Sequence, residues 1–290
     1  MDGRAVAPAA GTVLNALATG TGSAFAIDLE TTATVDLADD GDIDAAIAGE
    51  PEADTTLIER CVELTLSEYA ETAGLEPSTV GARVETDSEV PMASGLKSSS
   101  AAANATVLAT LDALEIADAV ERISACRVGV QAARDAGVTV TGAFDDASAS
   151  MLGGVTVTDN SAEKLLAHEE IDWHALVYTP PVQSFSADAD VTACKRIAPM
   201  ADLVAELALD GRYGEAMTVN GFAFCGALEF STAPMIDALP DVAGVSLSGT
   251  GPSYVAVGDR ETLEAVQTDW AERDGTTRLL QTRTDGTQVR

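Results

Sequence analysis

Basic residues are scarce in this chain of 290 residues. It has 16 lysines and arginines against 47 acidic residues, which gives a formal net charge of −31, and its only lysines are Lys97, Lys164 and Lys195. A surface this negative repels the phosphates of nucleic acids and the headgroups of anionic lipids. We therefore expect neither nucleic acid nor a membrane as a partner.

Cysteines and long apolar runs are also few. The cysteines lie far apart among apolar or helical neighbours, so we expect reduced core thiols rather than a disulfide framework or a zinc site. No apolar run approaches the ~20 residues of a membrane span, and the first residues do not resemble a signal peptide. These features favour a cytoplasmic protein. The cysteines are Cys61, Cys126, Cys194 and Cys225.

Residues 91–100, followed by an apolar run that favours helix, form the most informative segment. Gly95 lets the backbone approach an anion, and the N-terminus of the next helix carries roughly half a positive charge, so the segment predicts a loop that binds nucleotide phosphate. The alternative is an ordinary helix capped by one of the three serines. A Walker loop is excluded, because Leu96 stands where that motif needs glycine. The predicted ATP-binding residues are Pro91, Met92, Ala93, Ser94, Gly95, Leu96, Lys97, Ser98, Ser99 and Ser100.

This loop resembles the second signature of the GHMP kinases, P-x-x-x-G-L-x-S-S-[AS]. Residues 6–15 resemble the first motif of that family, which lines the acceptor site, and residues 245–253 resemble the third, a glycine-rich turn that packs against the nucleotide loop. The three segments occur in the family's order. The resemblance implies an α+β fold with an N-terminal domain like ribosomal protein S5 and a ferredoxin-like C-terminal domain.

Three details are similar to the archaeal shikimate kinases within this family. They are the loop sequence at residues 95–100, the sequence Leu-Asn-Ala at residues 14–16 where mevalonate kinases and galactokinases have Gly-Glu-His, and the segment at residues 141–150. The resemblance implies ATP and Mg²⁺ as cofactors and phosphorylation of the 3-hydroxyl of shikimate, a step of chorismate and aromatic amino-acid biosynthesis. Alternatives are homoserine kinase, a diphosphomevalonate decarboxylase of the same fold and a non-catalytic ligand sensor.

Phosphoryl transfer to an alcohol needs a group that positions or deprotonates the hydroxyl, and a divalent ion. The resemblance implies Asp145 as the base with Asp146 as its orienting partner, although capping of a helix would also explain either residue. Two adjacent carboxylates repel and can raise one pKa, but spacing does not decide which. Ser99 matches a serine that ligates magnesium in some relatives.

Shikimate carries a carboxylate, for which arginine offers bidentate geometry. Arg134 and Arg196 are the candidates, with Lys195 beside them, and each could instead balance local acidic residues. Thr12 and Asn15 are expected to bind acceptor hydroxyls or to stabilise a turn. The last predicted substrate-site residues form the glycine-rich turn, namely Gly249, Thr250 and Gly251, whereas His168 and His174 are expected to be surface or strand-edge residues.

The hydrophobic pattern predicts two α+β domains, at residues 1–160 and 161–290, with a polar linker at residues 158–172. No pattern predicts an oligomeric state. Expected helices are residues 55–73, 98–114, 118–136, 187–209, a stretch from residue 213, 232–239 and 261–273. Expected strands are residues 24–37, 81–86, 153–158, 175–179, 242–247 and 253–258.

The acidic excess generates a prediction about salt. Such a charge strains a compact fold by self-repulsion, whereas 46% hydrophobic residues argue against a disordered chain. At 1 M salt the Debye length is about 3 Å, so we expect a halophile's protein that is most stable above roughly 1 M potassium chloride. Thermal melting in dilute buffer and in molar salt checks this, and equal midpoints would contradict it.

Overall fold

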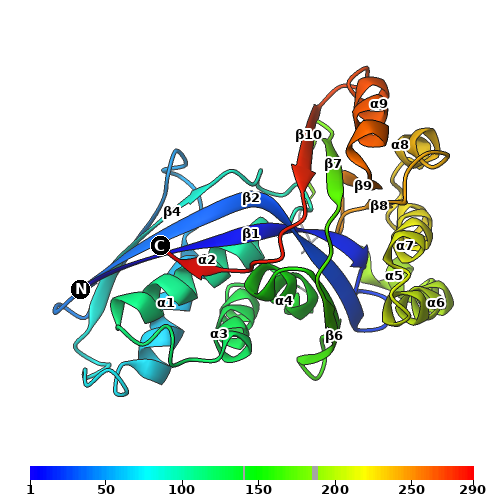
Figure 1. Ribbon diagram of the computed structural model, residues 1–290. Coiled ribbons are helices and arrows are strands. Elements are labelled where there is room, and N and C mark those ends of the chain that lie inside the picture. Colours follow the sequence, from blue (N-terminus) through cyan, green and yellow to red (C-terminus); the bar gives the residue numbers. More distant parts are fainter. Residues whose placement is uncertain (140, 185–188) are drawn as a thin grey trace.

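Two sheets organise the part of the chain that the structure, a computed structural model, describes: residues 1–139, 141–184 and 189–290 (Figure 1). The larger sheet has seven strands, of which five run in the order β11-β1-β2-β4-β3, while β5 pairs with β2 and β6 with β5. Among the described strands of this sheet, β3 and β4 form the one parallel pair. These strands are β1 (Asp2–Leu14), β2 (Thr21–Ala38), β3 (Ile43–Ile47), β4 (Gly81–Ser88), β5 (Val155–Asp159), β6 (Lys164–Glu169) and β11 (Gln288–Val289).

The β1–β2 hairpin is the backbone of this sheet. Its register shifts between Pro8 and Ala9, where a residue without an N–H can sit at a bulge without costing a ladder hydrogen bond. β2 then pairs with β4 through one half and with β5 through the other. The first motif thus lies on a strand that bends partway along its length.

Helices α1, α2 and α4 pack on one face of the larger sheet, with α2 at the centre, and α3 packs against these three helices (Figure 1). Apolar and small residues occupy every side of α2, the pattern of a helix surrounded by protein. Its alanines let β1 approach closely: a Cβ on Gly3 would stand 2.2 Å from the carbonyl oxygen of Ala109. The helices are α1 (Thr56–Tyr69), α2 (Ser98–Ala113), α3 (Arg122–Asp135) and α4 (Phe144–Leu152).

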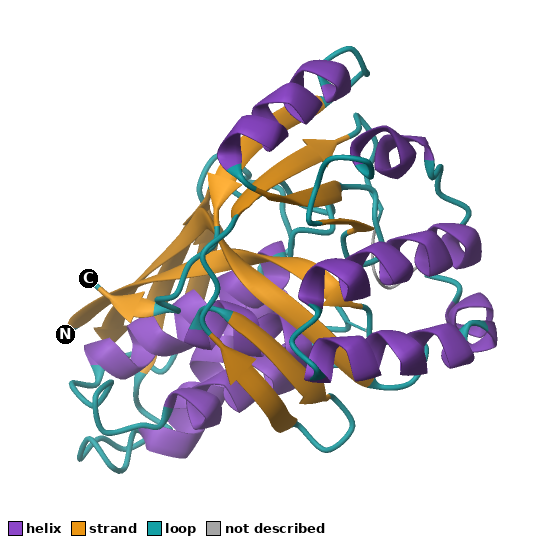
Figure 2. Ribbon diagram, turned by 45° about the vertical axis from the view of Figure 1, so that its right-hand side comes forward, coloured by secondary structure: helices purple, strands orange, loops and turns teal. Residues whose placement is uncertain are grey.

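The second sheet is antiparallel, in the order β10-β7-β9-β8, with its own helices beside it (Figure 2). Trp270 is fully buried here, and its Nε1 donates to the carbonyl of Pro234 at 3.0 Å. The strands are β7 (His174–Thr179), β8 (Gly244–Leu247), β9 (Tyr254–Gly258) and β10 (Thr276–Gln281). The helices are α5 (Val191–Arg196), α6 (Ala198–Leu209), α7 (Tyr213–Leu228), α8 (Ala233–Ala238) and α9 (Arg260–Trp270).

The last nine residues return to the larger sheet and pack against α4. The Thr287 hydroxyl donates to the carbonyl of Ser150 at 3.0 Å, and the Thr287 N–H donates to that of Met151 at 3.1 Å. Arg283 pairs with Glu30 on β2. These contacts satisfy carbonyl groups that the end of a helix leaves without intrahelical partners.

The predicted α+β fold is confirmed, and most predicted helices and strands overlap observed ones. The linker at residues 158–172 is wrong, because that stretch contains the end of β5 and all of β6. The helix expected at residues 187–209 is wrong as one unit, because the chain breaks at Ile197 and α6 begins at Ala198. Pro199, which has no N–H to donate, is tolerated in the first turn of that new helix. The start of that prediction, residues 187 and 188, lies outside the described residues.

A domain division at residue 160 stays a prediction. β6 and β11 follow that residue, yet both pair within the larger sheet. One hydrophobic cluster also joins residues of both regions, including Phe25 on β2 and Phe224 on α7. All four cysteines are buried and free, and no helix within the described ranges is long and apolar enough to cross a membrane.

The close packing of β1 on α2 predicts the effect of one added methyl group. Gly3→Ala should lower the free energy of unfolding by about 1–3 kcal/mol, because the new Cβ meets helix backbone that cannot rotate away. Gly226→Ala is the matched control. Gly226 is exposed within α7 with open space around it, so alanine there should stabilise by about 0.5–1 kcal/mol. Urea unfolding in high salt measures both values; equal effects would contradict the packing argument.

Candidate active site

The predicted phosphate loop ends in a helix start that no side chain caps. Lys97 is the N-cap of α2, with a left-handed backbone at φ 66°, and it makes no side-chain cap hydrogen bond. Ser98, Ser99 and Ser100 occupy the first helical turn, so the alternative of an ordinary helix capped by one of these serines is wrong. The N–H groups of that turn lack intrahelical partners, which leaves an anion-binding end on α2.

The loop packs directly on the glycine-rich turn between β8 and β9. Gly95 has φ +82°, and a Cβ there would stand 2.3 Å from the carbonyl oxygen of Ser248. The Ser248 hydroxyl donates to the carbonyl of Gly95 at 2.9 Å, and the Ser253 N–H donates to that of Ser94 at 3.2 Å. The second and third motifs therefore form one structure.

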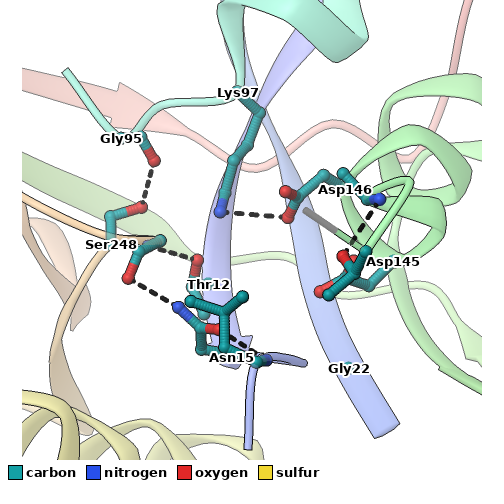
Figure 3. A network of polar contacts seen from close by, with 12 residues as sticks. Thr12, Asn15, Gly22, Gly95, Lys97, Asp145, Asp146 and Ser248 are labelled. Carbon is teal, nitrogen blue, oxygen red and sulfur yellow. Dashed lines mark hydrogen bonds and ion pairs between the residues drawn. The ribbon is translucent and has the colours of Figure 1, made fainter. Parts of the chain in front are cut away.

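The first motif completes this structure from the end of β1 (Figure 3). The Thr12 hydroxyl accepts from the N–H of Gly249 at 2.8 Å, and the Asn15 side-chain amide donates to the Gly249 carbonyl at 2.8 Å. Asn15 Oδ1 also accepts from the N–H of Leu17 at 2.9 Å. These bonds use the side chains of Thr12 and Asn15 to hold backbone, while Asn15 still borders the cavity described next.

A cavity opens where the three motifs meet α4. Within the described residues Lys97 is the one cation on its wall, and Asp145 and Asp146 are its acids. The lining residues are Asn15, Ala16, Leu17, Lys97, Thr139, Thr141, Ala143, Asp145, Asp146, Gly249 and Thr250.

Asp146 and Lys97 form an ion pair across the cavity. The Lys97 Nζ lies 3.0 Å from Asp146 Oδ1, and the two side chains are only 9% and 14% exposed. Figure 3 shows the Lys97 side chain reaching toward Asp146. Gly249 leaves the space for the ammonium, since a Cβ there would lie 2.7 Å from Nζ. The pair thus links the start of α2 to the first turn of α4.

Asp145 is buried beside this pair, at 4% exposure. Its Oδ1 accepts from the side-chain amide of Asn160 at 2.7 Å. Gly22 on β2 makes room on the other side, because a Cβ there would stand 2.3 Å from Asp145 Oδ2. Burial first, and repulsion from Asp146 second, raise the pKa of Asp145 to about 7, against the opposing effects of Lys97 and Asn160.

The predicted arginines do not reach the cavity wall. Arg134 forms an ion pair with Glu163, and its guanidinium packs against Gly142. Arg196 is exposed on α5 beside Lys195. Their binding of a substrate carboxylate stays a prediction. His168 on β6 contacts the carbonyl of Gly153, the C-cap residue of α4, through its Nε2 and does not line the cavity.

Sequence reasoning missed three residues that build the site. They are Gly22, Asn160 and Asn220, whose Oδ1 accepts from the N–H of Asn15 at 3.0 Å. None stands in a motif, and each acts through a partner distant in sequence. Only an aligned set of relatives could have carried a signal for them.

Comparison with known proteins agrees with this geometry. Residues 56–154 match the family described as GHMP kinases N terminal domain. Proteins named shikimate kinase from two strains of Halobacterium salinarum are 61% identical over the whole of both chains. A shikimate kinase of Methanococcoides burtonii is 48% identical over 97% of this chain and 96% of its own.

Solved structures show the same fold at low identity. Homoserine kinase of Cytophaga hutchinsonii superposes with a TM-score of 0.77 at 18% identity, covering 100% of this chain and 97% of that one. Mevalonate kinase of Methanococcus jannaschii gives 0.74 at 15%, covering 96% and 98%. Because the fold is that of these enzymes and the 61% identity runs from end to end, this chain belongs to the GHMP kinases, in one family with the archaeal shikimate kinases.

Proposed function

We propose that this chain is an ATP-dependent shikimate kinase, which transfers the γ-phosphoryl group of ATP to the 3-hydroxyl of shikimate. The observation that carries the proposal is the 61% identity to proteins of that name over both complete chains. The cavity supports it chemically, because Lys97, the N-cap residue of α2, and the buried carboxyl of Asp145 both line it.

In this proposal the start of α2 binds the phosphates of ATP. The free N–H groups of its first turn and the ammonium of Lys97 are aimed where negative charge develops during transfer, and such fixed donors need no reorganisation. Lys97 is held before the substrate arrives by its ion pair with Asp146. The loop is therefore arranged for an anion in advance.

Asp145 is the proposed base. It takes the proton of the acceptor hydroxyl while the hydroxyl oxygen attacks the γ-phosphorus and ADP leaves. A base is most effective when its pKa lies near the working pH, and the burial of Asp145 raises its pKa to about 7. Asp146, tied to Lys97, is the orienting partner in this assignment.

Mg²⁺ is proposed as the metal that accompanies ATP. The described residues contain no cluster of three metal-ligating side chains, but Mg²⁺ in kinases is held by one or two protein oxygens together with substrate phosphates. The hydroxyl of Ser99, in the first turn of α2, fits that need as a hard oxygen ligand. The ion would neutralise phosphate charge.

The alternative functions explain fewer of these observations. Homoserine kinase shares the fold, but the solved homoserine kinase of Cytophaga hutchinsonii is only 18% identical. A decarboxylase must bind a substrate diphosphate, and the described cavity wall offers one cation. A ligand sensor would not need the buried Asp145 beside the phosphate loop. We also propose a cytoplasmic enzyme adapted to concentrated salt, on the grounds of its charge of −31.

The substrate assignment predicts a selective assay. In high potassium chloride the purified protein should release ADP with shikimate and form shikimate 3-phosphate, while homoserine and mevalonate should be poor acceptors. A coupled assay that offers the three side by side measures this. Turnover of homoserine without turnover of shikimate would overturn the substrate and leave the fold intact.

The base assignment predicts opposite effects on activity and stability. Asp145→Asn should lower kcat by about 10²-fold or more with little change in the KM for ATP. The same variant should melt at a higher temperature than the native protein above pH 7. A carboxyl whose pKa is raised in the folded state makes the folded protein less stable as the pH rises from about 4 through 7. Asparagine does not ionise, so the variant does not lose stability in this way.

Asp146→Asn is the matched control for both measurements. It should lower kcat less, and it should lower the melting temperature, because Lys97 loses its buried partner. If Asp146→Asn proves the more damaging to kcat and Asp145→Asn is nearly silent, the two roles must be exchanged.

A further inference from the structure

Asn160 lies immediately beyond β5 and does not line the cavity, yet its side chain contacts Asp145 at both ends. The residue is 1% exposed, and its N–H donates to the carbonyl of Gly20 at 2.9 Å, which anchors it to the turn before β2. Asparagine at such a turn ordinarily bonds to its own neighbouring backbone. Here the amide reaches across to another element.

Two donors fix which way this amide points. The N–H of Asp145 lies 3.1 Å from Asn160 Oδ1, and the Thr158 hydroxyl lies 2.7 Å from the same atom. A backbone N–H can only donate, so the atom facing it must be the amide oxygen. The amide nitrogen is therefore the atom that lies 2.7 Å from Asp145 Oδ1, where it donates.

The carboxyl of Asp145 has little freedom on its remaining side. Its Oδ2 lies against Gly22, where even one added carbon would be 2.3 Å away. The charged groups that act on it are Asp146, on the same helix, and Lys97, at the start of α2. Asn160 is the side-chain amide that donates to this carboxyl, beside the backbone N–H of Asp146, so it favours the ionised carboxyl without adding charge.

We propose that Asn160 is a positioning residue of this site: its amide holds the carboxyl of Asp145 in one direction and favours its ionised form. This inference rests on the proposed function, since it concerns the base of that reaction. In this assignment a residue that stands outside every motif controls the pH at which the base works.

A purely structural role is the competing explanation. Asn160 Oδ1 satisfies the N–H of Asp145, which belongs to the first turn of α4 and lacks an intrahelical partner. In that case the residue is only a helix cap supplied from another element. Asn160→Asp separates the two roles. It keeps an oxygen acceptor for that N–H, but replaces the amide donor with a second carboxylate facing Asp145.

The experiment measures kcat against pH at saturating ATP and shikimate, together with thermal melting. For Asn160→Asp we expect a folded protein with little change in the KM for ATP or for shikimate. The acid limb of its kcat profile should move to higher pH by roughly one unit or more, because a second carboxylate close to Asp145 raises the pKa of Asp145. Asn104→Ala is the matched control. It removes a buried amide of α2 that donates at 2.9 Å to the carbonyl of Ala147 on α4, the helix that also carries Asp145. The variant should therefore lower the melting temperature and leave the acid limb of kcat in place.

Titration of the Asp145 carboxyl by ¹³C NMR in the ligand-free protein gives a readout independent of turnover. Its midpoint should rise in Asn160→Asp and stay unchanged in Asn104→Ala. A midpoint or an acid limb that does not move in Asn160→Asp overturns the proposal. Absence of shikimate 3-phosphate from the native protein would instead refute the proposed function, so the two failures are distinguishable.

Discussion

The Lys97–Asp146 ion pair is the contact on which the arrangement of the site depends. It joins the N-termini of α2 and α4, two helices whose starts carry positive partial charge and face one cavity. Without a negative partner, Lys97 would be a third positive element in that space. Asp146 offsets this charge, and its presence next to Asp145 disfavours ionisation of the buried carboxyl. One pair therefore positions the cation and tunes the acid.

Glycine makes this density of charge sterically possible. Gly22 admits the carboxyl of Asp145, Gly249 admits the ammonium of Lys97, and Gly95 admits the carbonyl of Ser248. In each case a single added carbon would lie closer than 3 Å to a polar atom of the site. The three glycines come from β2, the third motif and the phosphate loop. The site is thus assembled from elements whose contacts with one another leave no room for side chains.

The local features of the site could be predicted from sequence, and its long-range contacts could not. Three motifs in order identify the family and the loop, because each is a short run whose chemistry is local. The contact between Asn15 and Gly249 spans 234 positions, and no local pattern encodes it. The alternative of a serine cap fails for the same reason: serine is the better cap locally, but Lys97 is the N-cap, with a left-handed backbone and its ammonium paired with Asp146. β6 escapes prediction because none of its residues is buried, and its apolar residues form one short run instead of alternating with polar ones.

The return of the last nine residues to α4 and β1 ties the two ends of the chain together. β11 pairs with β1, and Thr287 holds the carboxyl end of the helix whose first turn carries Asp145. During synthesis β1 leaves the ribosome well before its partner β11. The larger sheet therefore cannot be completed until β11 has been made, and contacts so distant in sequence form slowly. The helix that carries both acids of the cavity gains the support of Thr287 only after β10, the last strand of the second sheet, has been synthesised.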